Sequence, residues 1–402
     1  MLQKINLKLV VAFGLYGTGL FALLLADLMI SAFWTETQIA NWAEFKSLLF
    51  IVGGLAALGC DQAVLRFQHS GMSIIRYMVP RSALFIVIAT IGYAQFSDDV
   101  DIAIAMSASL CFALLSLFAG NFRASQLFVL SQLSTQTWKI LLLFMLLASY
   151  FFLPELQLQQ ILVGALAAAV AFAIVMGWKT LAQQNEAVDR KELQTIGASF
   201  MLHNATLVTA IYGEQLILNT LSGEQASVAL FRHVAVFTPI ALGFSGFAGF
   251  VIAPKIRAMQ VIKPYQYRRF LFISGGVGLA TVGLSLVVGL GIHYFVFLDD
   301  FEIFWPLVAV MMGTCWLRAI YVVPSSVIGT LADAAILRRT ALANWLFLAL
   351  YLIVAVIIVG QLSVLHAALA VAILSFLNWC CRIAYASYCA VVHVSVKENY
   401  NE

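Results

Sequence analysis

Long apolar segments of about 20 residues alternate with short polar connections along the chain, and each is long enough to cross the hydrocarbon layer as a helix. The segments lack the apolar–polar alternation of a membrane β-strand. A hydropathy window of about 19 residues predicts about twelve spanning helices. Their predicted ranges are 9–33, 42–60, 80–96, 102–120, 137–153, 158–177, 197–219, 226–252, 269–294, 303–323, 340–360 and 364–390. The pattern predicts an all-α integral membrane protein.

Composition supports this interpretation. Charged residues make up 10% of the 402 residues and hydrophobic residues make up 63%, whereas a soluble domain is roughly a quarter charged. The six cysteines show no metal-ligand spacing and are read as apolar packing residues, so no metal is predicted. We also find no cofactor motif and no set of catalytic residues.

The charges of the connecting segments predict the orientation. If the N-terminus is cytoplasmic, the basic residues fall in the inner loops and the acids in the outer loops, as the positive-inside rule requires. The basic residues are Arg66, Arg76, Arg123, Lys179, Arg190, Lys191, Lys255, Arg257, Lys263, Arg268, Arg269, Arg338, Arg339 and Lys397. The acids are Asp98, Asp99, Asp101, Glu155, Glu224, Asp299, Asp300 and Glu302. Both termini are therefore predicted to be cytoplasmic, and the net charge of +3 gives no indication of nucleic-acid binding.

A polar stretch near the middle of the chain, at about 178–196, predicts two lobes of six helices. The predicted N-lobe is 1–180, the cytoplasmic inter-lobe loop is 181–196, and the C-lobe is 197–402. Two such halves favour a substrate path between them. The chain has no GxxxxGK[ST] motif for nucleotide binding. Its short loops also argue against a polymerase or acyltransferase, which would need room for a catalytic domain.

Ionisable residues inside the membrane are costly, so each is a functional hypothesis. Toward the inner side we place Lys139, His203, Arg318 and Arg382, and toward the outer side Asp27, Glu214 and Arg232. The cations suit an anionic substrate, because the guanidinium group binds phosphate with two parallel hydrogen bonds. The predicted substrate-binding residues are Arg318, Arg232, Arg382, Lys139 and His203. Asp27 and Glu214 are the predicted ion-coupling residues.

Each of these predictions has a structural alternative. Lys139 and Arg382 lie close enough to helix ends to extend toward the headgroups, and Glu214 could reach the outer headgroups. Against that, His203, Thr206, Ala210, Gly213 and Glu214 share one narrow face of the seventh predicted helix. Such a face favours a cavity rather than lipid. Pro239 predicts a kink in the eighth helix, which is either a hinge or a packing feature.

Three stretches resemble the Wzx-type O-antigen flippases of the multidrug/oligosaccharidyl-lipid/polysaccharide (MOP) superfamily. The first, within 42–67, carries Leu58, Gly59, Asp61, Gln62, Ala63, Arg66 and Phe67. The second, 212–234, carries Glu214, Gly223, Glu224 and Phe231. The third, VIAPKIRAM, carries Pro254 and Arg257. Glu214 stands where the family more often has Asp, and Phe231 stands where it often has Tyr.

The resemblance implies a MOP/MATE-like fold with two six-helix lobes around a central cavity with a cationic lumen. It implies a non-enzymatic flippase of the bacterial inner membrane that moves undecaprenyl-pyrophosphate-linked oligosaccharide to the periplasmic leaflet by alternating access. A polysaccharide polymerase and a chain-length regulator are the implied protein partners. A drug or small-solute antiporter of the same superfamily and, less favoured, a membrane-embedded polymerase or acyltransferase stay open as alternatives.

Overall fold

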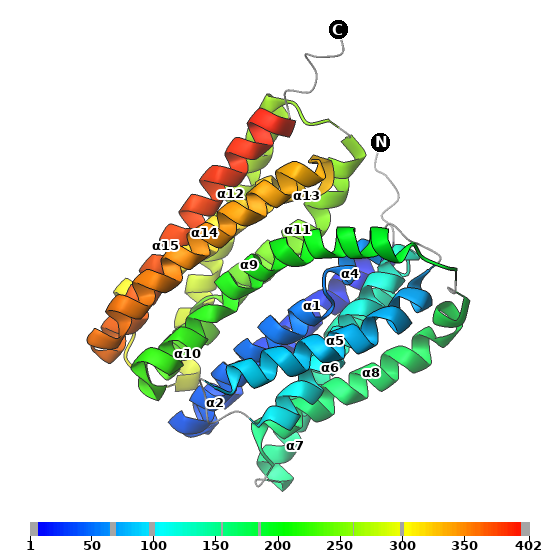
Figure 1. The fold of residues 1–402 in the computed structure, drawn as a ribbon. Coiled ribbons are helices and arrows are strands. Elements are labelled where there is room, and N and C mark those ends of the chain that lie inside the picture. The colour runs from blue at the N-terminus through cyan, green and yellow to red at the C-terminus, as the bar shows by residue number, and fades with distance from the viewer. Residues whose placement is uncertain are drawn as a thin grey trace. The chain divides into compact units, whose positions relative to one another are not determined.

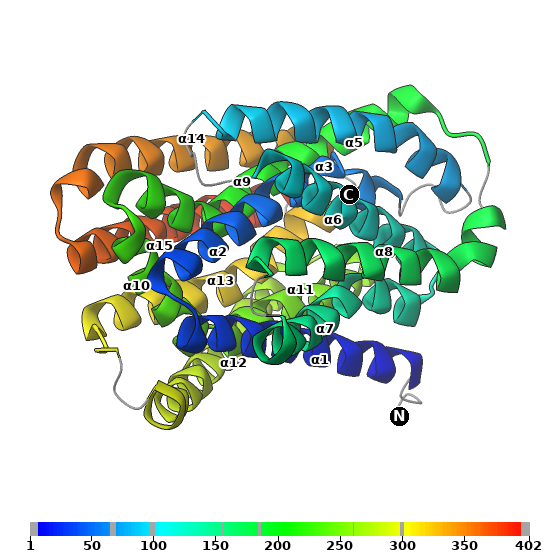
Figure 2. The same cartoon turned by 90° about the horizontal axis from the view of Figure 1, so that it is seen from below.

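The fold was analysed in a computed structural model, which describes residues 7–64, 70–95, 101–153, 156–183, 186–259, 261–297 and 301–394. All regular secondary structure in these ranges is helical (Figures 1 and 2). Ten of the described helices are long and apolar enough to span a membrane, or eleven if one bent pair forms a single span. The prediction of an all-α membrane protein is confirmed, and the number twelve stays a prediction.

Several residues used in the sequence argument lie outside the described residues. They are Arg66, Phe67, Asp98, Asp99, Glu155, Asp299, Asp300 and Lys397. Pro254 and Arg257 fall within a described helix, but their side chains are not described.

The chain divides into two compact units, Met1–Leu216 and Ile217–Glu402. Unit 1 is built from α1 to α8 and most of α9. Their bounds are α1 Leu7–Phe33, α2 Glu36–Leu48, α3 Gly54–Ala56, α4 Cys60–Ala63, α5 Gly71–Tyr93, α6 Ile102–Ala124, α7 Phe128–Phe152, α8 Leu158–Gln183 and α9 Arg190–Ser222. A π-helical segment, Leu49–Gly53, joins α2 to α3, so the two form one continuous apolar span.

Unit 2 contains the last turns of α9 and six longer helices. Their bounds are α10 Glu224–Phe237, α11 Pro239–Met259, α12 Pro264–Ile292, α13 Trp305–Leu331, α14 Ala334–Ile358 and α15 Val364–Cys389. Its apolar core joins α9, α10, α13, α14 and α15 through buried residues that include Leu218, Leu230, Leu307 and Val371. Burial of this kind holds the helices together as one unit.

The outward faces of both units are apolar. Phe272 on α12 is 84% exposed and Val175 on α8 is 75% exposed, and many other large apolar side chains are exposed along the spans. A protein surrounded by water rarely exposes apolar surface on this scale. These faces therefore contact the lipid bilayer.

Short polar side chains define where several helices begin. Thr35 accepts a hydrogen bond from the backbone of Gln38 and starts α2. Asp101 caps α6 by accepting from the Ile104 N–H at 3.0 Å, and Asp333 caps α14 by accepting from the Ile336 N–H at 2.8 Å. These bonds satisfy backbone donors that have no partner within the helix. Asp101, one of the acids predicted to lie in an outer loop, therefore has a structural role as a helix cap.

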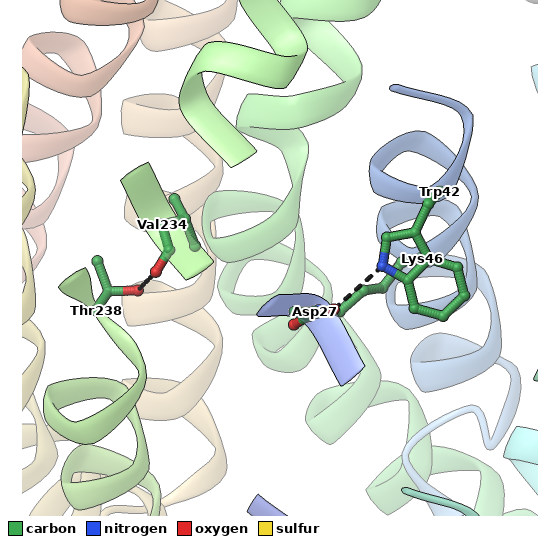
Figure 3. A network of polar contacts seen from close by, with 5 residues as sticks. All are labelled: Asp27, Trp42, Lys46, Val234 and Thr238. Carbon is green, nitrogen blue, oxygen red and sulfur yellow. Dashed lines mark hydrogen bonds and ion pairs between the residues drawn. The ribbon is translucent and has the colours of Figure 1, made fainter. Parts of the chain in front are cut away.

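The eighth predicted segment is bent, as Pro239 predicts. Helices α10 and α11 meet at 67°. Pro239 has no N–H to continue the helical ladder, so a new helix begins there. The Thr238 hydroxyl donates a hydrogen bond to the Val234 carbonyl at 2.8 Å (Figure 3). This bond gives a hydrogen-bond partner to one of the last carbonyls of α10.

The polar stretch between the predicted lobes is mostly helical. Helix α8 extends to Gln183 and α9 begins at Arg190, so the predicted loop 181–196 shortens to a few residues. Polar residues predict a loop here, but many of them lie where the two helices extend beyond their apolar parts. Unit 1 also ends later than the predicted N-lobe, within α9. The division into two six-helix lobes stays a prediction.

Candidate functional site

Two arginines inside unit 2 pack against one tryptophan. The Cζ atom of Arg318 lies 5.2 Å from the ring centroid of Trp379, and that of Arg382 lies 5.7 Å from it. Trp379 and Arg382 are three residues apart on α15, so they share a helix face. An indole ring attracts cations through its quadrupole. The structure thus brings together two of the predicted substrate-binding residues.

Amide groups orient the deeper of these arginines. The Nε of Arg382 donates to Asn378 Oδ1 at 3.2 Å, and an Nη donates to the Asn344 carbonyl at 3.5 Å. Arg382 is completely buried, whereas Arg318 is half-buried. Arg382 was predicted near a helix end, where it could extend to the headgroups. Its burial excludes contact with solvent or headgroups and makes it a fixed interior charge.

The helices that carry this cluster hold charge of one sign. Every Arg, Lys, Asp or Glu residue on α13, α14 and α15 is an arginine. Two polar atoms beside the arginines, Trp379 Nε1 and Asn344 Oδ1, make no hydrogen bond to the described residues. A buried donor without a partner is costly. This region therefore holds positive charge and an indole N–H in the interior of unit 2.

The other candidates in unit 2 lie on α10. His233 is buried, and its Nδ1 pairs with the Ala229 carbonyl at 2.7 Å. Its Nε2 accepts from the Phe304 N–H at 3.1 Å, so the ring is neutral and connects α10 to the segment before α13. Arg232, next to it, is half-buried.

Unit 1 contains a different kind of polar cluster. Asp27 on α1 forms an ion pair with Lys46 on α2 and accepts a hydrogen bond from Trp42 Nε1 at 3.1 Å (Figure 3). Trp42 and Lys46 are four residues apart, so one face of α2 supplies both partners. The predicted coupling carboxylate is therefore held by a cation and an indole.

Lys139 belongs to the same region of unit 1. It lies near the middle of α7, deeper than predicted, and donates to Gln136 Oε1 at 2.8 Å. Its ammonium group and that of Lys46 are close enough to repel each other. It also lies 5.7 Å from the ring centroid of Trp138. The structure thus places Lys139 near Lys46, the cation that pairs with Asp27.

The predicted polar face of α9 points into the protein. Thr206, Ala210 and Gly213 are buried, while His203 and Glu214 are half-buried. None of the five is classed as exposed, and the prediction that this face lines a cavity stays a prediction. α9 itself is not among the ten apolar helices, because polar residues interrupt it throughout its length.

The first of the three family-like stretches forms a tight turn in unit 1. Leu58 and Gly59 have left-handed backbone conformations, with φ of 51° and 72°. A Cβ on Gly59 would collide with the Gly197 carbonyl of α9, so the close contact requires glycine. Next to this turn, burial raises the pKa of the Asp61 carboxyl, while the positive charge of Arg123 and hydrogen bonds from Gln62 oppose the increase.

Sequence analysis missed Trp42, Lys46 and Trp379. The predicted second span starts at residue 42, which puts Lys46 near its end, but α2 begins at Glu36. The signals were present: Trp42 and Lys46 have i, i+4 spacing, and Trp379 and Arg382 have i, i+3 spacing. Only the fold shows which helix each pair faces.

Among the described residues, no group of three or more His, Cys, Asp or Glu side chains could hold a metal ion. No protein-family model and no curated protein sequence matches the chain.

Proposed function

We propose that this chain is a flippase that moves undecaprenyl-pyrophosphate-linked oligosaccharide from the cytoplasmic to the periplasmic leaflet of the bacterial inner membrane. The observation that carries the proposal is the pair of arginines, Arg318 and Arg382, inside a unit whose α13, α14 and α15 carry no acid. A pyrophosphate cannot enter a low-dielectric interior without compensating cations.

The two arginines differ in burial, and this difference fits two roles in binding a pyrophosphate. Arg382 is buried and held by Asn378 and Asn344, so it supplies a fixed positive potential. Arg318 is half-buried and is the one that would contact the diphosphate through its planar fork. Transport needs no bond to be broken, so the chain would act without catalytic residues, by alternating access between two six-helix lobes.

Asp27 and Glu214 are the candidate ion-coupling residues of this transporter. Asp27 faces a lysine, and a carboxylate that gains a proton would release that lysine from its ion pair. A proton arriving at Asp27 would thereby change the charge of a buried site. That is the type of event that can bias a transporter between two states.

The alternative function, antiport of drugs or small solutes, is less well supported for cationic cargo. A site for cationic drugs needs carboxylates or aromatic walls near the cargo. The interior charges of α13 and α15 are arginines instead, and like charges repel.

Arg318 variants test the proposal. In cells whose surface polysaccharide depends on this chain, Arg318→Ala should abolish surface polysaccharide. Arg318→Lys should retain part of it, because lysine keeps the charge and loses the fork. Arg318→Glu should fail at least as severely as alanine. Arg268→Ala, at an exposed arginine on α12, is the matched control and should export normally. Immunoblots of the membrane fraction must show equal amounts of each variant.

Wild-type export from a well-expressed Arg318→Ala protein would remove this residue from the substrate path and refute the proposal. The proposed topology has its own test. Reporter fusions after Asp189 and Lys263 should indicate cytoplasm, and fusions after Asp101 and Glu302 should indicate periplasm. A reversal at either pair would contradict cytoplasmic termini.

A further inference from the structure

Tyr77, near the start of α5, is contacted by two arginines from different helices. The Cζ of Arg81 lies 3.6 Å from the Tyr77 ring centroid, and that of Arg190, at the start of α9, lies 5.3 Å from it. Gln194 Nε2 donates to the Tyr77 hydroxyl at 2.6 Å, and Arg81 Nη1 donates to the Tyr77 carbonyl at 2.8 Å. These contacts hold the first turns of α5 and α9 together (Figure 1).

The guanidinium groups of this cluster are accessible and unbalanced. Arg81 and Arg190 are exposed, and Arg76 is exposed one residue before Tyr77. In the described part of the chain, neither Arg81 nor Arg190 pairs with a carboxylate. The nearby Asp189 accepts hydrogen bonds from the backbone N–H groups of Lys191 and Glu192, so it serves as a helix cap. The cluster presents positive charge outward.

The same face of α5 continues as an apolar surface. Leu84, Ile88 and Ile91 follow Tyr77 and Arg81 at helical spacing, and they are 61%, 65% and 47% exposed. From Arg81 to Ile91 the helix rises about 15 Å, which is half of the roughly 30 Å hydrocarbon layer. One face of α5 thus has Arg81 at one end, near Arg190 of α9, and apolar side chains over the depth of one leaflet.

We propose that this face of α5 binds one anionic phospholipid, with its phosphate on Arg81 and Arg190 and an acyl chain along Leu84, Ile88 and Ile91. Charge complementarity identifies the headgroup, because two guanidinium forks suit phosphate oxygens. The length of the apolar ridge identifies a lipid and not a soluble anion. The lipid fixes α9 to α5 at the leaflet that this end of α5 faces. The site is independent of the transported substrate.

Native mass spectrometry of the purified full-length chain in a neutral detergent tests the site, with phosphatidylglycerol as probe and phosphatidylcholine as reference. Wild type should retain phosphatidylglycerol preferentially. Each basic residue near an anionic headgroup contributes a factor of about five, so Arg81→Gln with Arg190→Gln should weaken binding roughly 25-fold. Arg268→Gln with Arg269→Gln, two exposed arginines on α12, is the matched control and should bind as wild type does.

Two further pairs of variants separate the site from general charge and from loss of fold. Arg81→Lys with Arg190→Lys keeps the charge and loses the forks, so binding should fall while gel filtration stays unchanged. Tyr77→Leu removes the aromatic platform and should weaken binding, whereas Tyr77→Phe keeps the ring and should not.

Unchanged binding in the lysine variant would overturn the proposal, because general charge would then explain the adduct. Equal loss in the Arg268 and Arg269 control, or equal retention of phosphatidylcholine, would also overturn it. Inorganic phosphate is the third probe. If it displaces phosphatidylglycerol at equal molar amounts, the cluster is a site for a soluble anion and the assignment to lipid is wrong.

Discussion

The interiors of the two units handle charge in different ways. In unit 1, a carboxylate and a lysine, Asp27 and Lys46, form a buried ion pair that Trp42 also contacts. In unit 2, two arginines share the ring of Trp379, and the helices that carry them contain no acid. The Asp27 carboxylate of unit 1 thus has a cationic partner beside it, whereas the two arginines of unit 2 lie on helices that hold no carboxylate.

The difference separates two functions that a coupled transporter must combine. The net charge of an ion pair changes when its carboxylate gains a proton, and such a change suits ion coupling. A cluster with charge of one sign is suited to a ligand of the opposite sign. Under the proposed function, coupling belongs to unit 1 and cargo recognition to unit 2, and each part of this proposal can be tested separately.

The largest effect is expected from separating the charges of unit 1. Removing one member of a buried ion pair leaves the other uncompensated, so Asp27→Asn or Lys46→Met should each lower the free energy of unfolding by about 3 kcal/mol. Asparagine still accepts the hydrogen bond from Trp42, so its effect isolates the charge. The measurement is denaturant unfolding of the purified chain in detergent micelles.

The double variant, Asp27→Asn with Lys46→Met, should be close to wild type in stability, because neither charge is then stranded. Lys179→Met, at an exposed lysine on α8, serves as the control and should have no effect. Additive losses in the double variant would show that Asp27 and Lys46 are not energetically coupled, and the contrast between the units would fail.

A smaller effect is expected from removing the buried guanidinium of unit 2. Arg382→Met keeps most of the side-chain volume but leaves Asn378 Oδ1 and the Asn344 carbonyl without this donor. Lost hydrogen bonds at buried oxygens should lower the free energy of unfolding by about 2 kcal/mol. Surface polysaccharide should fall further than that loss of folded protein explains. Normal export per folded molecule would exclude Arg382 from cargo recognition.

The smallest effect on stability is expected at Asp61, the carboxyl of unit 1 that lies near Arg123. Burial raises the pKa of its carboxyl, so the folded state favours the protonated form. Stability from this group is then fully present below the unfolded pKa of about 3.9 and falls as pH rises through the folded-state value. Asp61→Asn should remove this dependence and stabilise the chain near neutral pH by about 1 kcal/mol or less.

Thermal unfolding at acidic and neutral pH measures the difference. Asp101→Asn is the control, because asparagine also caps helices, and it reports the general effect of removing one carboxylate. If Asp61→Asn destabilises the chain more at neutral than at acidic pH, the attraction of Arg123 exceeds the cost of burial and the sign assigned here is wrong.

The positions of most helices and the membrane class could be predicted from the sequence. Both follow from interactions that are local or that depend on the lipid alone: apolar runs must cross the bilayer as helices, and Pro239 must end one. The sequence also identified the costly charges, Asp27, Lys139, Arg318 and Arg382, since an ionisable side chain in an apolar segment is visible without any fold.

Only the tertiary structure decided which of these charges meet. Asp27 on α1 meets Lys46 on α2, and Arg318 and Arg382 lie beside Trp379 because α13 and α15 pack together. Helical periodicity shows which residues share a face, but it does not show which other helix that face contacts. The turn at Gly59 also depends on the tertiary structure, because glycine is required there by the nearby α9 backbone at Gly197. Which side chains contact each other depends on packing between segments that are apart in the sequence. For that reason the sequence identified the charged residues, and only the fold showed their contacts.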